Sequence, residues 1–440
     1  MNDSSATANL TSVPEETSEE DQNHETATET VNKLPSAFSA KPDRPPIQRS
    51  LNFKNSIASH QSAGVPNLNF STSYSVCSSI TPRKLTKNFK MMEENGQIVD
   101  VRIESGVNSL VLGHSCKIEI IEYLFFFWIS SQKYAPIDWL GYFDQEDDIR
   151  IQDSNDVFHI YTAGTKGPVV FCLHGGGYSG LSFALSASKM KEKVRVVAMD
   201  LRGHGMSSTE DELDLSIETL CNDVLAVLKK MYGDSPPAIV LVGHSMGGSV
   251  AVHVAAKKAL PSLAGLIVVD VVEGTAMASL VHMQKILSNR MQHFSSIEKA
   301  IEWSVKGGSL RNIESARLSI PSTLKYDEAK KCYTHRAKLE ETEQYWRGWD
   351  EYEGLSEKFL SSPVPKILLL AGTDRLDRTL TIGQMQGKFQ MVVVRHTGHA
   401  IQEDVPEEFA TLVLNFIHRN RIGPHGVEIP GILRPSVSKP

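Results

Sequence analysis

The pentapeptide Gly-His-Ser-Met-Gly at 243–247 is the strongest chemical signal in the sequence. It lies between an apolar, β-branched run at 238–242 and a run of small, helix-compatible residues at 248–252. A buried strand, a Gly-x-Ser-x-Gly turn and a helix form a nucleophile elbow, which raises one serine hydroxyl above a sheet on a strained turn. The pentapeptide alone also fits an ordinary turn with a capping serine. If neighbouring motifs agree, Ser245 is the nucleophile.

Histidines late in the chain are candidates for the base that a serine nucleophile requires, because a neutral hydroxyl must lose its proton to react. We expect His399 to be this base, since it follows the last apolar run and a glycine. The order serine, acid, histidine is typical of the motif. His396 competes but lies nearer the strand. His174 and His204 are interpreted as residues that fix loop geometry.

Two aspartates are candidates for the acid that orients the histidine. Asp374 follows the penultimate predicted strand, the more usual position, whereas Asp270 follows the strand before it. Strand order alone favours Asp374 slightly and leaves the choice open. Glu273 and Asp377 are weaker candidates and are expected to be solvated.

A glycine run at 175–177 supplies a second part of the chemistry, because it directly follows the buried apolar run at 168–173 and His174. Ester hydrolysis passes through a tetrahedral oxyanion, which backbone N–H groups stabilise by about 3 kcal/mol per donor. We expect donors at Gly176, Gly177 and Met246. The elbow, the late histidine and the glycine run together predict an α/β-hydrolase with a serine nucleophile and with no metal or organic cofactor.

The elements that must position these residues alternate between apolar runs and helical patterns from about residue 133. This alternation predicts an α/β fold with a mostly parallel central sheet and helices on both faces. Helices are expected at 216–231, after the elbow, and at 406–417. The strand at 156–161 is expected to lie at the edge of the sheet. The expected strands span 156–161, 168–173, 194–199, 238–242, 265–269, 366–370 and 391–394.

A long segment, about 274–363, separates two of the late strands. A crossover of this length is predicted to be a helical lid inserted over the sheet. Its helices are expected around 280–287, 297–305 and 340–349.

The ends of the chain are expected to lie outside the α/β-hydrolase domain at 133–422. Residues 1–132 are polar and acidic, and such sequence cannot bury enough apolar surface to offset the entropy of ordering, which predicts a disordered tail. Within it, the aromatic stretch at 118–129 is too short to span a bilayer. We interpret it as an insertion, for which a mispredicted exon is one explanation. Residues 423–440 are expected to be a C-terminal tail.

Composition excludes several classes of protein. The 440 residues are 41% hydrophobic and 22% charged, as in globular proteins, and the net charge of −7 favours neither nucleic acid nor an anionic membrane as partner. The five cysteines are scattered, so neither a disulfide framework nor a zinc site is expected. No secretory signal is apparent at the N-terminus. We expect an intracellular protein, cytoplasmic and with the nucleus as a second location.

Several further strings resemble the protein phosphatase methylesterases, and the likeness covers about 133–422. It implies removal of the methyl ester from the C-terminal leucine of a type 2A protein phosphatase catalytic subunit, whose tail is the substrate. It also implies that the acid is Asp270, which opens the first string, and that Asp374 is structural or shapes the mouth of the site near Arg375. The strings are DVVEGTAM at 270–277, AIEWSVK at 300–306, YWRGW at 345–349, LLLAGTDRLD at 368–377 and LTIGQMQGKFQM at 380–391.

Two other functions remain open on the sequence. An α/β-hydrolase that acts on small-molecule esters would carry the same catalytic parts. A phosphatase-binding inhibitor with secondary hydrolysis would share the surface for the phosphatase. Epoxide and haloalkane hydrolysis are disfavoured, because those reactions need a carboxylate where this chain has Ser245.

Overall fold

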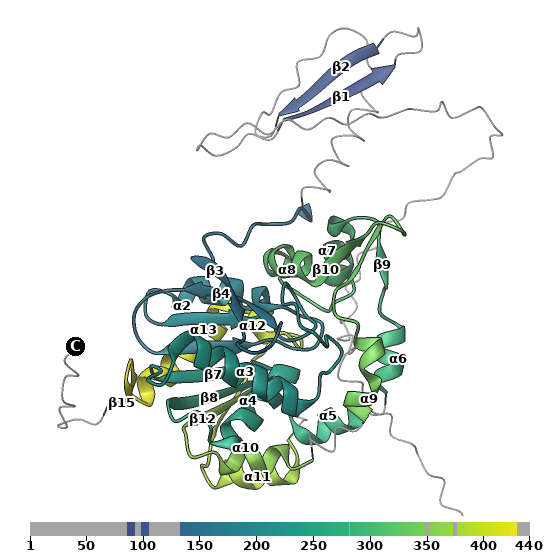
Figure 1. Cartoon of the computed structure of the whole chain (residues 1–440). Helices are drawn as coiled ribbons and strands as arrows, with labels where there is room; N and C mark the ends of the chain where they lie inside the picture. The colour runs from purple at the N-terminus through teal and green to yellow at the C-terminus, as the bar shows by residue number, and fades with distance from the viewer. Residues whose placement is uncertain are drawn as a thin grey trace, which may run out of the picture. The chain divides into compact units, whose positions relative to one another are not determined.

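One mixed sheet of eight strands forms the centre of the fold, in the order β13-β12-β8-β7-β5-β6-β4-β3 (Figure 1). The computed structural model describes residues 86–92, 98–104, 133–280, 282–347, 353–372 and 376–428. The strands of the large sheet are β3 (Gln145–Arg150), β4 (Val157–Ala163), β5 (Val169–Leu173), β6 (Arg195–Met199), β7 (Ile239–His244), β8 (Leu263–Val269), β12 (Lys366–Leu370) and β13 (Gln390–Val393).

Every neighbouring pair from β13 to β6 is parallel, whereas β4 runs antiparallel to both β6 and β3. The predicted α/β class with a mostly parallel sheet is therefore confirmed. The expected edge position of the strand at 156–161 was wrong, because β3 lies outside β4. The sequence of β3, Gln-Glu-Asp-Asp-Ile-Arg, has no apolar alternation, and charged side chains are typical of an exposed edge strand.

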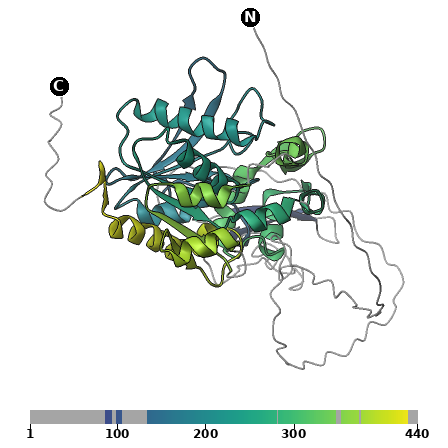
Figure 2. The same ribbon diagram turned by 90° about the horizontal axis from the view of Figure 1, so that it is seen from below.

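Helices cover both faces of the sheet because its central strands are apolar on both sides. Phe171 and Leu241 pack with α3 (Ile217–Tyr232), α4 (Met246–Lys257) and α10 (Leu355–Ser361), together with α11 (Arg378–Met385). Val170 and Val240, one position away along the same strands, pack with α2 (Ala184–Met190), α12 (Ile401–Asp404) and α13 (Pro406–Arg419). Figure 2 shows α3, in teal, and α13, in yellow, on opposite sides of the sheet.

The segment between β8 and β12 mixes helices with a small three-stranded antiparallel sheet of order β10-β11-β9. This sheet was not predicted, because strands of two to four residues leave little periodicity. The helix expected around 297–305 is present as α7. Where a helix was expected around 340–349, the chain forms the 3-10 turn η3 followed by the short helix α9. The elements are α5 (Glu273–Leu280), α6 (Met283–Ser288), β9 (His293–Phe294), α7 (Ile297–Lys306), α8 (Ile313–Ser319), η2 (Ile320–Thr323), β10 (Leu324–Asp327), β11 (Cys332–His335), η3 (Leu339–Thr342) and α9 (Glu343–Arg347).

The segment expected to form a lid, about 274–363, ends in a helix that packs on the sheet. Helix α10 buries Leu355 and Phe359 in the same core cluster as the sheet residues Phe171 and Leu241. It therefore covers the sheet. Residues 273–347, from α5 to α9, form an insertion between β8 and β12 that lies to the right of the sheet in Figure 1.

Short ladders lie in both terminal segments. β1 (Thr86–Met92) and β2 (Ile98–Glu104) form an antiparallel pair in which Lys90 faces Asp100, so the expectation of disorder through residue 132 was wrong for these strands. β14 (Ile422–Gly423) pairs with β15 (Gly426–Val427), where a tail was expected. The aromatic stretch at 118–129 and the end of the chain from 429 lie outside the described residues. No helix in the described part is long and apolar enough to cross a membrane.

Candidate active site

Ser245 lies on a strained turn between β7 and α4. Its backbone has φ 52° and ψ −120°, a conformation that costs energy for a residue with a side chain. The turn is held by the Ser245 N–H, which donates to the carbonyl of Val269 at 3.0 Å. A Cβ on Gly243 would collide with the backbone of Gly247, and a Cβ on Gly247 would collide with the carbonyl of Leu173. The two glycines are therefore required sterically, and Ser245 stays half-buried.

His399 and Asp270 form the central hydrogen bond of the site. Nδ1–H of His399 donates to Oδ2 of Asp270 at 2.8 Å, and the other carboxylate oxygen accepts the N–H of Ala371 at 2.9 Å. The Asp270 side chain is 0% exposed and that of His399 is 15% exposed. A buried carboxylate fixes the histidine tautomer that leaves Nε2 as the proton acceptor.

The competing candidates take different places. Asp374 lies outside the described residues. His396 is exposed, and no contact between it and Asp270 is seen in the described part of the chain. Asp377 caps α11 by accepting the N–H of Leu380 at 2.8 Å, and Glu273 accepts the N–H of Ser356 at 2.8 Å, so both serve local structure.

His244 joins the serine turn to the histidine loop, and sequence reasoning missed it. Its Nε2–H donates to the carbonyl of His399 at 3.0 Å, and the two rings lie 4.7 Å apart. Burial, followed by the neighbouring His399, lowers the pKa of His244 to about 3, so this ring is neutral. Because His244 directly precedes Ser245, one residue of the elbow positions the loop of the proposed base. The variable position of the Gly-x-Ser-x-Gly motif carried no signal for this role.

Asp404 anchors the same loop from the other side. Its Oδ2 accepts the N–H of Gly398 at 2.6 Å, and its Oδ1 accepts the N–H of Arg311, from the insertion, at 2.7 Å. The glycine before His399 is therefore fixed by a carboxylate five residues beyond that histidine. Nothing in the sequence pattern distinguished Asp404 from a surface acid.

The glycine run contains one expected oxyanion donor that is already engaged. Gly177 N–H donates to Nε2 of His204 at 2.9 Å, so the expectation that Gly177 faces the oxyanion was wrong. Gly176 lies beside Met246, because a Cβ on Gly176 would be 3.8 Å from the Met246 sulfur. Met246 is the first residue of α4, where N–H groups have no partner within the helix. Gly176 and Met246 therefore remain the candidate donors.

His174 and His204 fix the geometry of the loops, as the sequence predicts. Since a backbone N–H can only donate, His204 accepts through Nε2 and donates from Nδ1 to the carbonyl of Arg202 at 2.7 Å. His174 likewise accepts the N–H of Leu201 at 2.9 Å and donates to the carbonyl of Gly175 at 2.8 Å. Burial lowers the pKa of His204 to about 4 and holds the pKa of His174 well below its usual value, so both rings are neutral.

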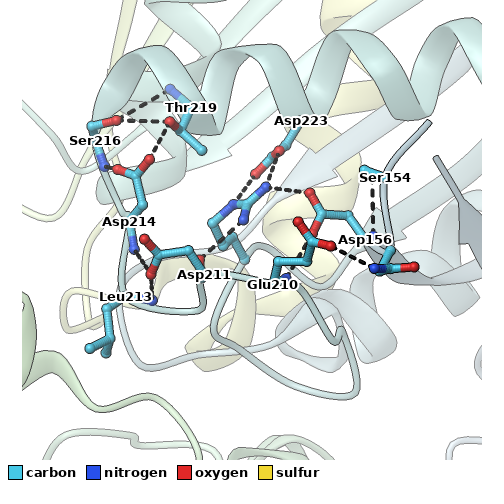
Figure 3. Close-up of polar contacts among 11 residues, drawn as sticks. Ser154, Asp156, Glu210, Asp211, Leu213, Asp214, Ser216, Thr219 and Asp223 are labelled. Carbon is cyan, nitrogen blue, oxygen red and sulfur yellow. Dashed lines mark hydrogen bonds and ion pairs between the residues drawn. The ribbon is translucent and has the colours of Figure 1, made fainter. Parts of the chain in front are cut away.

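The loop that carries His204 is fixed by the buried Arg202, whose partners Asp156, Asp211 and Asp223 are labelled in Figure 3. Arg202 binds both oxygens of Asp223 at 2.8 Å and an oxygen of Asp156 at 2.9 Å. It also donates to the carbonyl of Asp211 at 3.1 Å. A bidentate guanidinium–carboxylate pair is geometrically specific. The network thus holds the acceptor of the Gly177 N–H in place from outside the site.

The insertion covers the glycine run. A Cβ on Gly177 would lie 3.0 Å from Nη2 of Arg290 and 3.3 Å from Cδ1 of Leu339, and one on Gly176 would lie 3.8 Å from the same Leu339 carbon. Arg290 follows α6 and Leu339 opens η3. Two side chains from the insertion therefore lie against the backbone that is expected to bind the oxyanion.

The sheet order, the elbow turn and the hydrogen-bonded His–Asp pair define an α/β hydrolase. The model of the alpha/beta hydrolase family matches residues 169–412. An E-2-(acetamidomethylene)succinate hydrolase has a similar fold, with a TM-score of 0.52 at 18% identity over 62% of this chain and 99% of that chain.

Closer relatives narrow the family. The mouse protein named "Protein phosphatase methylesterase 1" is 45% identical over 333 residues, which cover 66% of this chain and 86% of the mouse protein. A Caenorhabditis elegans protein named "Probable protein phosphatase methylesterase 1" is 48% identical over 291 residues, covering 66% and 79%. The Schizosaccharomyces pombe protein named "Protein phosphatase methylesterase 1" is 41% identical over 295 residues, which cover 64% of this chain and 85% of the yeast protein. The chain belongs to the protein phosphatase methylesterase family, as its motifs predicted, and is a carboxylic ester hydrolase.

Proposed function

We propose that the protein removes the methyl ester from the C-terminal leucine of a type 2A protein phosphatase catalytic subunit, with Ser245, His399 and Asp270 as the catalytic triad. The observation that carries this proposal is the 2.8 Å hydrogen bond between His399 and the buried Asp270, in a loop that His244 joins to the strained turn of Ser245. The names of the relatives support a phosphatase as the substrate.

The first half of the reaction forms an acyl-enzyme. Ser245 Oγ attacks the ester carbonyl carbon while Nε2 of His399 takes its proton, and Asp270 stabilises the resulting imidazolium. The carbonyl oxygen becomes an oxyanion that accepts hydrogen bonds from Gly176 and Met246. When the intermediate collapses, the C–O bond to the methoxy group breaks, and His399 returns the proton to release methanol.

The second half restores the enzyme. A water molecule attacks the acyl carbon while His399 takes one of its protons, and the bond to Ser245 Oγ breaks as that proton is returned to the serine. The product is a carboxylic acid, which ionises at neutral pH. One ester and one water thus give one carboxylate, one proton and one methanol, and no other co-reactant is needed.

The proposal extends to the organisation of the chain. Residues 133–422 form the catalytic unit, and the insertion acts as the lid that contacts the phosphatase tail. Arg290 and Leu339 support this role because both lie against the glycine run. The protein acts inside the cell, where its phosphatase substrate is found.

The test is incubation of the methylated phosphatase catalytic subunit with the enzyme, followed by mass measurement of its C-terminal peptide. Ser245→Ala should leave the methyl ester intact while phosphatase binding persists. Ser288→Ala, which changes an exposed serine of α6, is the matched control and should retain full activity. Turnover of short generic esters without turnover of the phosphatase would favour a small-molecule esterase instead. Demethylation by Ser245→Ala would exclude the proposed mechanism.

A further inference from the structure

Arg290 brings a positive charge next to the glycine run from the insertion. Its Nη2 and Nη1 atoms would lie 3.0 Å and 3.2 Å from a Cβ on Gly177. Gly176, the candidate oxyanion donor, adjoins Gly177, and neighbouring Cα atoms are about 3.8 Å apart. The guanidinium therefore lies about one residue's length from Gly176. The charge therefore lies close to the place where the substrate carbonyl would bind.

Among the described residues, the side chain of Arg290 has a neutral hydrogen-bond partner. Nη2 of Arg290 donates to Nδ1 of His335 at 3.1 Å. His335 in turn donates from Nε2 to the carbonyl of Met291 at 3.0 Å, which leaves Nδ1 as an acceptor. Burial, followed by the charge on Arg290, lowers the pKa of His335 to about 4, so this ring does not compete as a cation.

No carboxylate lies within ion-pair distance of Arg290 in the part of the chain that the structure describes. Glu340 contributes a favourable charge, but its side chain is exposed and accepts a hydrogen bond from Gln292 at 3.0 Å. Burial lowers the pKa of Arg290 without neutralising an arginine at physiological pH. A cation withdrawn from water without an anionic partner is costly, and the bond to His335 uses one of five N–H donors.

The reaction itself generates an anion at this place. The methyl ester is neutral, whereas its hydrolysis product carries a carboxylate at the same carbon. We propose that Arg290 binds this new C-terminal carboxylate, so that the site holds the product acid more tightly than the neutral ester or an amide. This inference rests on the proposed function. It makes Arg290 the residue through which the product inhibits the enzyme.

The proposal is tested with peptide inhibitors of the wild-type enzyme and its variants. An acetylated dipeptide ending in leucine is prepared as the acid and as the amide, and each is titrated against hydrolysis of the matching methyl ester. The wild type should bind the acid about tenfold more tightly than the amide, which corresponds to about 1.4 kcal/mol. Arg290→Met should bind both equally, and Arg290→Lys should retain part of the preference.

Arg336→Met is the matched control, because Arg336 is a half-buried arginine of the same insertion that donates to the carbonyl of Leu324 at 2.8 Å. This variant should keep the preference for the acid. A third inhibitor, acetyl-aspartyl-leucinamide, carries its carboxylate on a side chain. Tighter binding of this amide than of the leucine-terminated acid would assign Arg290 to a side-chain carboxylate and overturn the inference.

The outcomes separate this inference from the proposed function. A wild type that hydrolyses the methyl ester but binds acid and amide equally overturns the role of Arg290 and leaves the esterase intact. A wild type that hydrolyses neither the peptide ester nor the methylated phosphatase contradicts the proposed function. If Arg290→Met does not fold, as judged by its melting curve, the wild type and Arg290→Lys still decide the question.

Discussion

The two sides of the active site are built in different ways. On the sheet side, Ser245 and Asp270 follow the buried strands β7 and β8, and hydrogen bonds to backbone groups hold them: the Ser245 N–H donates to Val269, and the Asp270 carboxylate accepts from Ala371. On the insertion side, side chains reach the site from short elements, and α5 fully buries none of its residues. The difference suggests that the sheet side determines the rate of the chemistry and the insertion side determines which substrate is bound.

The sharpest test of this division is Asp270→Asn on the sheet side. Loss of the carboxylate should lower kcat by about 10⁴-fold, because His399 loses the partner that fixes its tautomer. Demethylation kinetics provide the measurement, and binding of the phosphatase should not change. A near-normal rate, together with an inactive Asp374→Asn variant, would transfer the role of the acid to Asp374.

A second test moves one contact away from the chemistry. His204→Ala removes the acceptor of the Gly177 N–H and should lower kcat by about 10²-fold, because small displacements of catalytic groups have effects of this size. The value of kcat from steady-state kinetics and the rate at which a fluorophosphonate labels Ser245 should fall together. Unchanged labelling would mean that the glycine run keeps its geometry without His204.

On the insertion side, the division predicts a different kinetic signature. Leu339→Ala should raise KM by about tenfold, which is typical for loss of apolar contact with a substrate, while kcat stays within about twofold. The assay is demethylation at varied phosphatase concentration. A fall in kcat at constant KM would break the comparison, because the insertion would then contribute to the chemical step.

The smallest predicted effect concerns Glu403, which joins the two sides. This buried carboxyl group on α12 accepts hydrogen bonds from the hydroxyls of Ser315 and Ser319 on α8, at 2.8 Å and 2.6 Å. Burial raises the pKa of Glu403 to about 8. The folded state therefore holds a proton that the unfolded state releases near pH 4.5, so its stabilising contribution is lost as pH rises from there towards 8.

Glu403→Gln keeps an acceptor for both serines and does not ionise. The melting temperature of the wild type should fall between pH 5 and pH 8 by a few degrees more than that of the variant. Scanning calorimetry at several pH values measures the difference. Parallel curves would show that Glu403 does not change its protonation on unfolding.

The sequence predicted the sheet side well and the insertion side poorly, for a physical reason. Buried strands such as β5 and β7 are continuous apolar runs, and the tight turn at Ser245 demands glycines at fixed positions. Choosing Asp270 over Asp374 needed the family resemblance, because both aspartates follow strands. The edge strand β3 is charged and left no periodic signal.

Other features depended on contacts between residues distant in sequence. The observed role of Gly177 differs from the predicted one because its N–H donates a hydrogen bond to His204, which is 27 positions away in the sequence. The approach of Arg290 to the glycine run could not be read from a short insertion helix with no motif of its own. Local pattern therefore pointed to the proposed reacting groups, whereas the groups around them required coordinates.

The left-handed backbone at Ser245 has an implication for selection on this enzyme. Such a conformation costs about 1–3 kcal/mol when a side chain is present and almost nothing in glycine. Ser245→Gly should therefore yield an inactive protein that melts at a higher temperature than the wild type. Thermal stability favours glycine at this position, whereas catalysis requires serine. A chain that keeps serine there has been selected for its activity at the expense of stability.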